Sequence, residues 1–439
     1  MKQTVDIIPR MDPRCPERKA LQDNAFKHAL QEAVREHVEG TFFHVGAYPA
    51  DDGHPRTRTP FEIQQPVTYA GTESYQDNKE VLEQIDALTN TGSLATIICG
   101  DQQTFARMVC LRRLDPELFS HIVPLPGEMH LCAHFLHAVW RLYWNKYLHW
   151  FAVRMEMEAT IKEEWPVKQW NPHDDFMFII LSACLRFLGR HCPPHLFEYD
   201  RCLRAAQGNI NLQMMLHFVY DCGLPYLILR NSIRKHPTAQ TRKQILLVYN
   251  VCMHLCRPNE SNKFQYAILC VQGVWTYYNM IPCLRRIWDR MSTVSLSGFP
   301  GRNVAIDHLC EKVNLSSKVI IGNYPTNGRI RTWVPALNIL MPCQAYYFNY
   351  MASIGHDDDD EDTDCRSQKA DREATIQAAE TLVAHAVGDT WDDATNDNDD
   401  ICTVMYAGAR EGLCPWEIVE QKQADWHLYV LAKQEEMLS

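Results

Sequence analysis

The chain has 439 residues, of which 46% are hydrophobic and 22% are charged, the composition of an ordinary globular protein. At roughly 100–200 residues per domain, it is long enough for two or three domains with a sizeable core. Lys and Arg number 43 against 54 Asp and Glu, so the formal net charge is −11, which over the whole chain argues against a nucleic-acid partner.

Membrane proteins and secreted disulfide scaffolds are also disfavoured. The longest nearly uninterrupted apolar run, around Phe176–Leu185, has about ten residues, whereas a membrane-spanning helix needs about 20. The sequence from Met1 to Asp6 has no apolar signal-peptide core. The 17 cysteines are an odd number and are scattered through apolar helical stretches. We therefore expect free, mostly buried thiols in a reducing compartment, either the nucleus or the cytosol.

Residues 1–134 mix strand and helix patterns, which favours an α/β sheet. The first helix is expected over Leu21–Val38, although Asp23-Asn24 near its start can instead close a short preceding strand. The other expected elements are, in chain order, a strand over Thr41–Tyr48, a helix over Asn78–Leu88, a strand over Leu94–Cys99, a helix over Thr104–Leu114, a strand over His121–Leu125 and a helix that begins near His130.

Residues 135–295 are expected to be all-helical. The apolar stretches that predict helices are Phe135–Met157, Phe176–Gly189, Leu212–Lys235, Thr241–Leu255 and Lys263–Met291. An aromatic stripe in the first of them has helical spacing, which favours a core face over a base-stacking platform: Trp140, Tyr143, Trp144, Tyr147 and Trp150. Residues 296–350 begin with a Gly/Ser/Pro loop and enter a further helix near Ala305.

The C-terminal part carries the charge imbalance. Between Asp357 and Asp400 there are 16 acidic and three basic residues, a local charge of −13, so the other 395 residues carry about +2. The whole-chain charge therefore does not exclude a DNA partner for the folded part. Residues 351–400 are expected to be acidic and largely disordered, because runs of like charge repel themselves, with a helix allowed over Glu373–Val387. Residues 401–439 are expected to hold a short helix, Trp416–Met437.

Two strand ends carry polar residues that favour a site. Asp101 directly follows the apolar strand, at the sheet edge where α/β proteins bind their ligands. The alternative is that Asp101 caps the following helix, since Asp is a favoured N-cap residue. Glu128 and His130 follow the next strand and can project toward the same edge. The alternative there is a first-turn acid favoured by the helix dipole, with His130 at the surface.

A third polar feature lies on the helix expected after Ala305. Four residues recur at intervals of four, three and four positions and would share one helical face: Asp307, Glu311, Asn314 and Lys318. The opposite face is apolar, so the helix is amphipathic whether this stripe is functional or simply solvated.

Together these pieces resemble a family of uncharacterised, transposon-derived proteins of eukaryotic mobile elements, whose core is expected to be ribonuclease H-like. The shared pattern is a strand ending in Gly-Asp-Gln, then Pro-Gly-acid-x-His, a long helical stretch, and Asp-x-x-x-Glu-x-x-Asn-x-x-x-Lys. The family pattern also has an earlier Asp-Asn and a Phe-His or His-Trp pair, matched here by Asp23-Asn24 and Phe43-His44. These short motifs are spread over residues 20–335.

The resemblance implies a transposase-type DNA nuclease or strand-transfer domain. Its fold would be α/β, a ribonuclease H-like mixed sheet interrupted by the helical residues 135–295 as an insertion. By position, Asp23, Asp101 and Glu311 would be the catalytic acids and would bind the metal. Carboxylate oxygens suit Mg²⁺ or Mn²⁺, and two such ions about 3.5–4 Å apart would stabilise the attacking and leaving oxygens of phosphodiester cleavage. The supporting or substrate-binding residues would be Glu128, His130, Asp307, Asn314 and Lys318.

The sequence departs from the family pattern in two places. Glu128 stands where the family usually has Asp, and Arg18–Gln22 is a poor match to the buried strand expected before a first catalytic acid. About 22 residues precede Asp23, so we expect no N-terminal DNA-binding domain. The alternative function is therefore a catalytically inactive, domesticated transposase that acts as a DNA- or protein-binding module. Its acidic segment would then bind basic proteins, and a homo-oligomer is compatible with either function.

Overall fold

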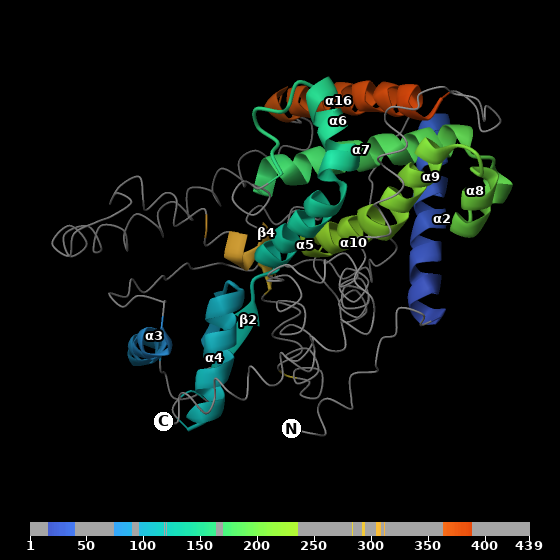
Figure 1. The fold of residues 1–439 in the computed structure, drawn as a ribbon. Helices are drawn as coiled ribbons and strands as arrows, with labels where there is room; N and C mark the ends of the chain where they lie inside the picture. The colour runs from blue at the N-terminus through green and yellow to red at the C-terminus, as the bar shows by residue number, and fades with distance from the viewer. Residues whose placement is uncertain are drawn as a thin grey trace.

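The computed structural model describes residues 16–39, 74–89, 96–117, 119, 121–163, 170–235, 283, 292–294, 304–308, 311 and 363–388. Within these ranges the fold is α/β and mostly helical, with one parallel pair of strands and one short antiparallel pair (Figure 1). Four expected elements lie outside the described residues: Thr41–Tyr48, Thr241–Leu255, Lys263–Met291 and Trp416–Met437. Within the third of these, only Cys283 is described.

The parallel pair is a β-α-β unit. β1 (Thr96–Gly100) pairs with β2 (Ile122–Pro126), so that Gly100 lies opposite Pro126 at one end of the register. Parallel strands need a crossover connection, and α4 (Gln102–Leu114) provides it. α3 (Tyr75–Thr89) packs against α4. These elements confirm the strands and helices expected here, and the two strands end at the same edge.

A helical body continues directly from β2. α5 (Glu128–Tyr143) leads through the π-helical turn η1 (Trp144–Leu148) into α6 (His149–Arg154). The long helix α7 (Trp170–His191) lies at its centre, with α2 (Pro16–Glu39) packed against it. The remaining elements of the body are η2 (Pro194–Leu196), α8 (Tyr199–Ala205), α9 (Ile210–His217), the π-helical η3 (Phe218–Gly223) and α10 (Leu224–Lys235).

The interior of this body is apolar and aromatic. Four residues of the aromatic stripe are at most 7% exposed, which confirms that the stripe is a core face: Trp140, Tyr143, Trp144 and Tyr147. The cysteines in the described part of the chain are free thiols, most of them buried, as expected. One stretch among the described residues, Ile210–Arg230, is long and apolar enough to cross a membrane, but 89% of its most apolar 18-residue window is buried inside the protein, as in a core helix.

A long helix from the acidic region packs on the helical body. α16 (Thr363–Val387) includes the helix expected over Glu373–Val387 and begins ten residues earlier. It runs beside α7 in the same direction (Figure 1), since successive ion pairs join Arg372 to Asp175, Glu373 to Arg186 and Glu380 to Arg190. Its buried face is apolar and consists of Ile376, Ala379, Val383 and Val387. Part of the acidic region is therefore an integral part of the folded core.

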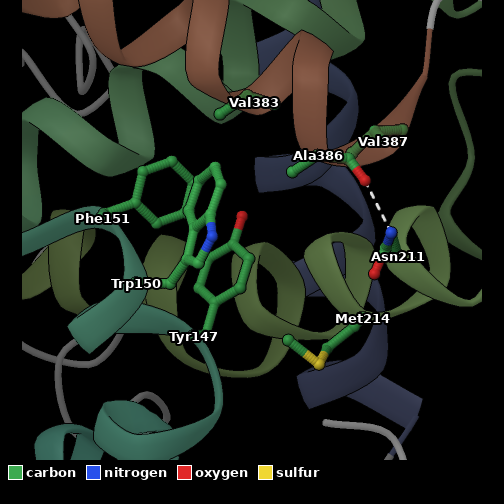
Figure 2. Close-up of a pocket in the computed structure, with 8 residues that line it drawn as sticks. All are labelled: Tyr147, Trp150, Phe151, Asn211, Met214, Val383, Ala386 and Val387. Carbon is green, nitrogen blue, oxygen red and sulfur yellow. Dashed lines mark hydrogen bonds between the residues drawn. The ribbon is translucent and has the colours of Figure 1, made fainter. Parts of the chain in front are cut away.

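The C-terminal end of α16 is held by two asparagine side chains. Nδ2 of Asn209 donates to the carbonyl of Val387 at 2.9 Å, and Nδ2 of Asn211 donates to that of Ala386 at 2.6 Å. Figure 2 shows Asn211 at the rim of a small apolar pocket between α16, α9 and the η1–α6 turn. Oδ1 of Asn209 also caps its own helix, α9, by accepting from the N–H of Leu212 at 2.9 Å. Asn209 thus joins two helix termini.

Acidification should loosen α16 through Glu373. The hydrogen bond from Arg186, together with the charge of that arginine, outweighs burial and lowers the pKa of Glu373 below its ordinary 4.5. Such a carboxylate stabilises the fold above its unfolded pKa, and that stability is lost as the pH falls through its folded pKa. Hydrogen exchange of the α16 amides should therefore show less protection in Glu373→Gln than in wild type at pH 7, and the difference should shrink below pH 4.5. A pH-independent difference would contradict this assignment.

The two roles of Asn209 can be separated by substitution. Asn209→Asp keeps the oxygen that caps α9 but loses the donor to Val387, whereas Asn209→Ala loses both. A hydrogen bond contributes about 0.5–1.5 kcal/mol and an N-cap about 1 kcal/mol. We expect urea unfolding to show a loss of about 1 kcal/mol for the Asp variant and about 2 kcal/mol for the Ala variant. An Asp variant as stable as wild type would show that the link to α16 carries no stability.

Candidate functional site at the sheet edge

Asp101 follows β1 and caps α4. Its Oδ1 accepts a hydrogen bond from the backbone N–H of Thr104 at 2.8 Å, and the residue is exposed. The expectation of a helix cap is therefore confirmed. Capping also fixes the carboxylate at the edge of the sheet, so a role as the N-cap of α4 is compatible with a role in a ligand site there.

The N-terminus of α5 is capped by a residue from a distant part of the chain. Gly127 occupies the N-cap position and has no side chain to offer. Asp307 supplies the carboxylate instead: Oδ1 accepts from the N–H of Met129 at 3.2 Å and Oδ2 from the N–H of His130 at 3.0 Å. Asp307 is only 4% exposed. The helix N-terminus carries partial positive charge and unpaired N–H groups, both of which stabilise a buried carboxylate.

Two short strands position Asp307. β4 (Val304–Ala305) pairs with β3 (Thr293–Val294) in an antiparallel ladder and packs against α10. Ala305 is buried in the main core at 2% exposure, which anchors the segment two residues before the carboxylate. The chain is helical at Ile306–His308, close to the helix start expected near Ala305.

Gly127 is required by the close approach of these segments. A Cβ atom there would lie 2.9 Å from Cγ of Asp307 and 2.9 Å from the carbonyl oxygen of Gly100. The N–H of Gly127 also donates to that carbonyl at 2.9 Å. Only glycine permits this contact between β1, β2 and Asp307. The Pro-Gly pair at the end of β2 thus has a steric explanation.

His130 is held between two carboxylates. Its Nδ1 lies 2.9 Å from Oδ2 of Asp307, and its Nε2 lies 3.9 Å from Oε1 of Glu311. A carboxylate can only accept, so Nδ1 carries the proton and Nε2 is the acceptor atom of the neutral ring. Burial alone would lower the pKa of His130, but the hydrogen bond and charge of Asp307, with the charges of Asp101 and Glu311, raise it above its ordinary 6.5.

The structure therefore brings together residues from three separate segments. We call the group the sheet-edge site; it consists of Asp101, Gly127, His130, Asp307 and Glu311. Glu128, the first residue of α5, is adjacent in sequence and is buried at 5% exposure. It is therefore not a solvated first-turn acid.

Asp23 lies elsewhere. It is on α2, which packs against α7, and its Oδ1 accepts a hydrogen bond from the hydroxyl of Tyr220 at 2.7 Å. Figure 1 shows α2 and β2 on opposite sides of the helical body. Asp23 and Asn24 lie within α2 and do not close a strand. Asp23 therefore does not lie beside Asp101, where the first catalytic acid was expected. Asn314 and Lys318 lie outside the described residues.

The possible metal ligands of the sheet-edge site do not include three carboxylates that could bind one ion together. Within the described ranges, no three His, Cys, Asp or Glu side chains form a group that could hold a metal ion. The two oxygens of Asp307 already accept three hydrogen bonds, so Asp307 is unsuited to be a ligand in this arrangement. Mg²⁺ in phosphoryl-transfer sites keeps several waters and uses one or two carboxylates plus substrate phosphates. At this edge, Asp101 is exposed and the side chain of Glu311 is 46% exposed, so both carboxylates are accessible to solvent.

Comparison with known proteins gives a match to a protein family over part of the chain. Residues 66–213, about a third of the chain, match the model of a family of unknown function (DUF6589). The matched range includes Asp101, Gly127 and His130, and ends within α9 before Asp307 and Glu311. No curated protein and no solved structure matches the chain.

The contact between Gly127 and Asp307 can be tested by a double-mutant cycle. Gly127→Ala introduces a methyl group against a carboxylate and a carbonyl, and overpacking of this kind costs about 1–3 kcal/mol. With Asp307→Ala already present, one of the two obstacles is gone, so the same change should cost less. Urea unfolding of the four proteins measures the coupling, and strictly additive losses would contradict the contact.

Proposed function

We propose that the chain is a transposase-derived DNA nuclease or strand-transfer domain with a ribonuclease H-like core, dependent on Mg²⁺ or Mn²⁺. The support comes from one observation: Asp101, His130 and Glu311 come from three segments and meet beyond the carboxyl ends of β1 and β2. Open α/β sheets bind their ligands at this edge. The same three segments carry the resemblance to transposon-derived proteins.

Each residue of the sheet-edge site has a role under this proposal. Asp101 and Glu311 are the metal-binding carboxylates, and a bound cation would polarise the scissile phosphate and activate water or a DNA 3′-hydroxyl. Asp307 orients His130, whose Nε2 faces Glu311. Lys318 and Asn314 would contact the phosphate backbone. DNA as substrate implies work in the nucleus, which agrees with the free thiols of the described cysteines.

A second candidate function is a catalytically inactive, domesticated copy that binds DNA or protein. Two observations favour it. Asp23, the expected first acid, lies on α2 with Tyr220, and the described residues contain no group of three potential metal ligands. The acidic runs on either side of α16 would serve as contacts for basic proteins. The two functions differ in whether the sheet-edge site supports metal-dependent cleavage.

Metal-dependent nicking of supercoiled plasmid DNA separates them. Asp101→Asn keeps the cap of α4, because Asn is an equally good N-cap, while removing the charge. Glu311→Gln is isosteric, and Glu117→Gln is a matched control at an exposed acid away from the site. Loss of an outer-shell partner typically costs 10–100-fold, so loss of a ligand should lower Mn²⁺-dependent nicking by about 100-fold or more. The control should retain wild-type activity.

Two outcomes would count against the nuclease. Equal activity in all four proteins would identify a contaminating nuclease. Absence of nicking by folded wild-type protein that still binds DNA would favour the inactive binding module.

A further inference from the structure

We propose that His130 is itself a metal-binding residue: its Nε2 and Glu311 share one divalent cation, with Asp307 as the positioning residue behind the ring. This inference rests on the proposed function, since the cation is the one that cleavage would need. It adds an imidazole ligand that the expected triad of acids does not contain.

The orientation of the ring is the first argument. Asp307 accepts from Nδ1 at 2.9 Å and also from the backbone N–H of the same histidine at 3.0 Å. The bond to Nδ1 selects, for the neutral ring, the tautomer whose unprotonated Nε2 faces Glu311, and a bound cation would replace the proton that Nε2 carries in the charged ring. Metal-binding histidines almost always donate their other ring N–H to a carboxylate or carbonyl, which orients the ring and raises its basicity. Asp307 supplies that outer carboxylate in buried form.

The distance to Glu311 is the second argument. Nε2 and Oε1 are 3.9 Å apart, and two atoms bound to one ion at about 2.1 Å each would be about 3–3.4 Å apart. The difference is under about 1 Å, and the side chain of Glu311 is 46% exposed and able to move by that amount. Water and phosphate oxygens would complete the coordination, as in other sites that bind the ion together with substrate.

The donor set also predicts which ion is preferred. Mg²⁺ strongly prefers oxygen ligands, whereas an imidazole nitrogen beside a carboxylate suits first-row transition metals. The site should therefore select Mn²⁺ over Mg²⁺. A surface pair elsewhere in the chain provides a matched control, because Nε2 of His149 lies 3.4 Å from Oε1 of Glu158, with both side chains about half exposed.

The experiment is Mn²⁺ binding to the full chain without DNA, followed by electron paramagnetic resonance. Wild type should bind Mn²⁺ and show a ¹⁴N coupling from the directly bound imidazole in pulsed spectra. His130→Gln keeps both backbone bonds to Asp307, so its fold should be intact, but it should lose the ¹⁴N coupling and bind Mn²⁺ about 10–100-fold more weakly. Mg²⁺ should then compete better. His149→Gln should behave as wild type, and folded Asp307→Asn protein, checked by circular dichroism, should bind Mn²⁺ more weakly by a similar factor.

The outcomes separate this inference from the proposed function. Equal Mn²⁺ affinity in His130→Gln, a bound ion without ¹⁴N coupling, or no Mn²⁺ binding by wild type would each overturn the role of His130. The nicking assay with Asp101→Asn and Glu311→Gln would still decide the nuclease. A protein that binds Mn²⁺ through His130 yet cleaves no DNA would uphold the metal site and refute the proposed function.

Discussion

The buried carboxylate of Asp307 is the contact on which the sheet-edge site depends. It accepts three hydrogen bonds, two from the backbone at the start of α5 and one from the ring of His130. Burying a carboxylate is costly unless it is fully hydrogen-bonded, and the helix N-terminus supplies both donors and favourable partial charge. Glu311, four residues further on, lies 3.9 Å from the other nitrogen of the same histidine ring. One interaction therefore caps a helix, orients a histidine and closes the site.

The helical body depends on a second interaction, the ion pair between α7 and α16. α7 is covered on one side by α2 and on another by α16, and Arg186, only 5% exposed, is paired with Glu373. A buried guanidinium needs such a partner, since an unpaired buried charge is strongly destabilising. The acidic C-terminal region thus contributes to the core as well as to the net charge. These two contributions come from different parts of the region. The apolar and ion-paired residues lie on α16, whereas the unbroken acidic runs lie before and after it in the sequence.

Much of the local structure could be predicted from sequence. β1, α4 and β2 were recognisable from apolar runs with abrupt polar ends, and α16 from a helical pattern between two acidic runs. The aromatic stripe on α5 and η1 was correctly assigned to the core from its spacing. Strand and helix patterns extend over a few neighbouring residues, so they can be recognised in the sequence without knowledge of the tertiary fold.

The site was harder to predict because its key contact is not local. The strand ends predicted that Asp101, Glu128 and His130 lie at one edge, and the family resemblance added Glu311. Asp307 was expected only as a supporting residue on a polar stripe. Nothing in the local pattern indicates that Asp307 caps a helix 177 residues earlier. The one available signal was Gly127, an N-cap residue with no capping side chain of its own. Asp23 was misplaced for the opposite reason: a two-residue motif match cannot outweigh the helical periodicity of the segment around it.

The long sequence separation of the Asp307 contact has a consequence for how the molecule is assembled. Closing a loop of this size costs entropy that must be recovered by contacts formed only when the ends meet. The helical body between α5 and β4 therefore has to be largely in place before the site can close, and the site should be among the last parts to form. A fragment ending at residue 213, where the family match stops, would hold Asp101 and His130 but leave the start of α5 without its carboxylate. The sheet-edge site thus depends on segments far apart in the chain, even though its most recognisable motif occupies a few residues.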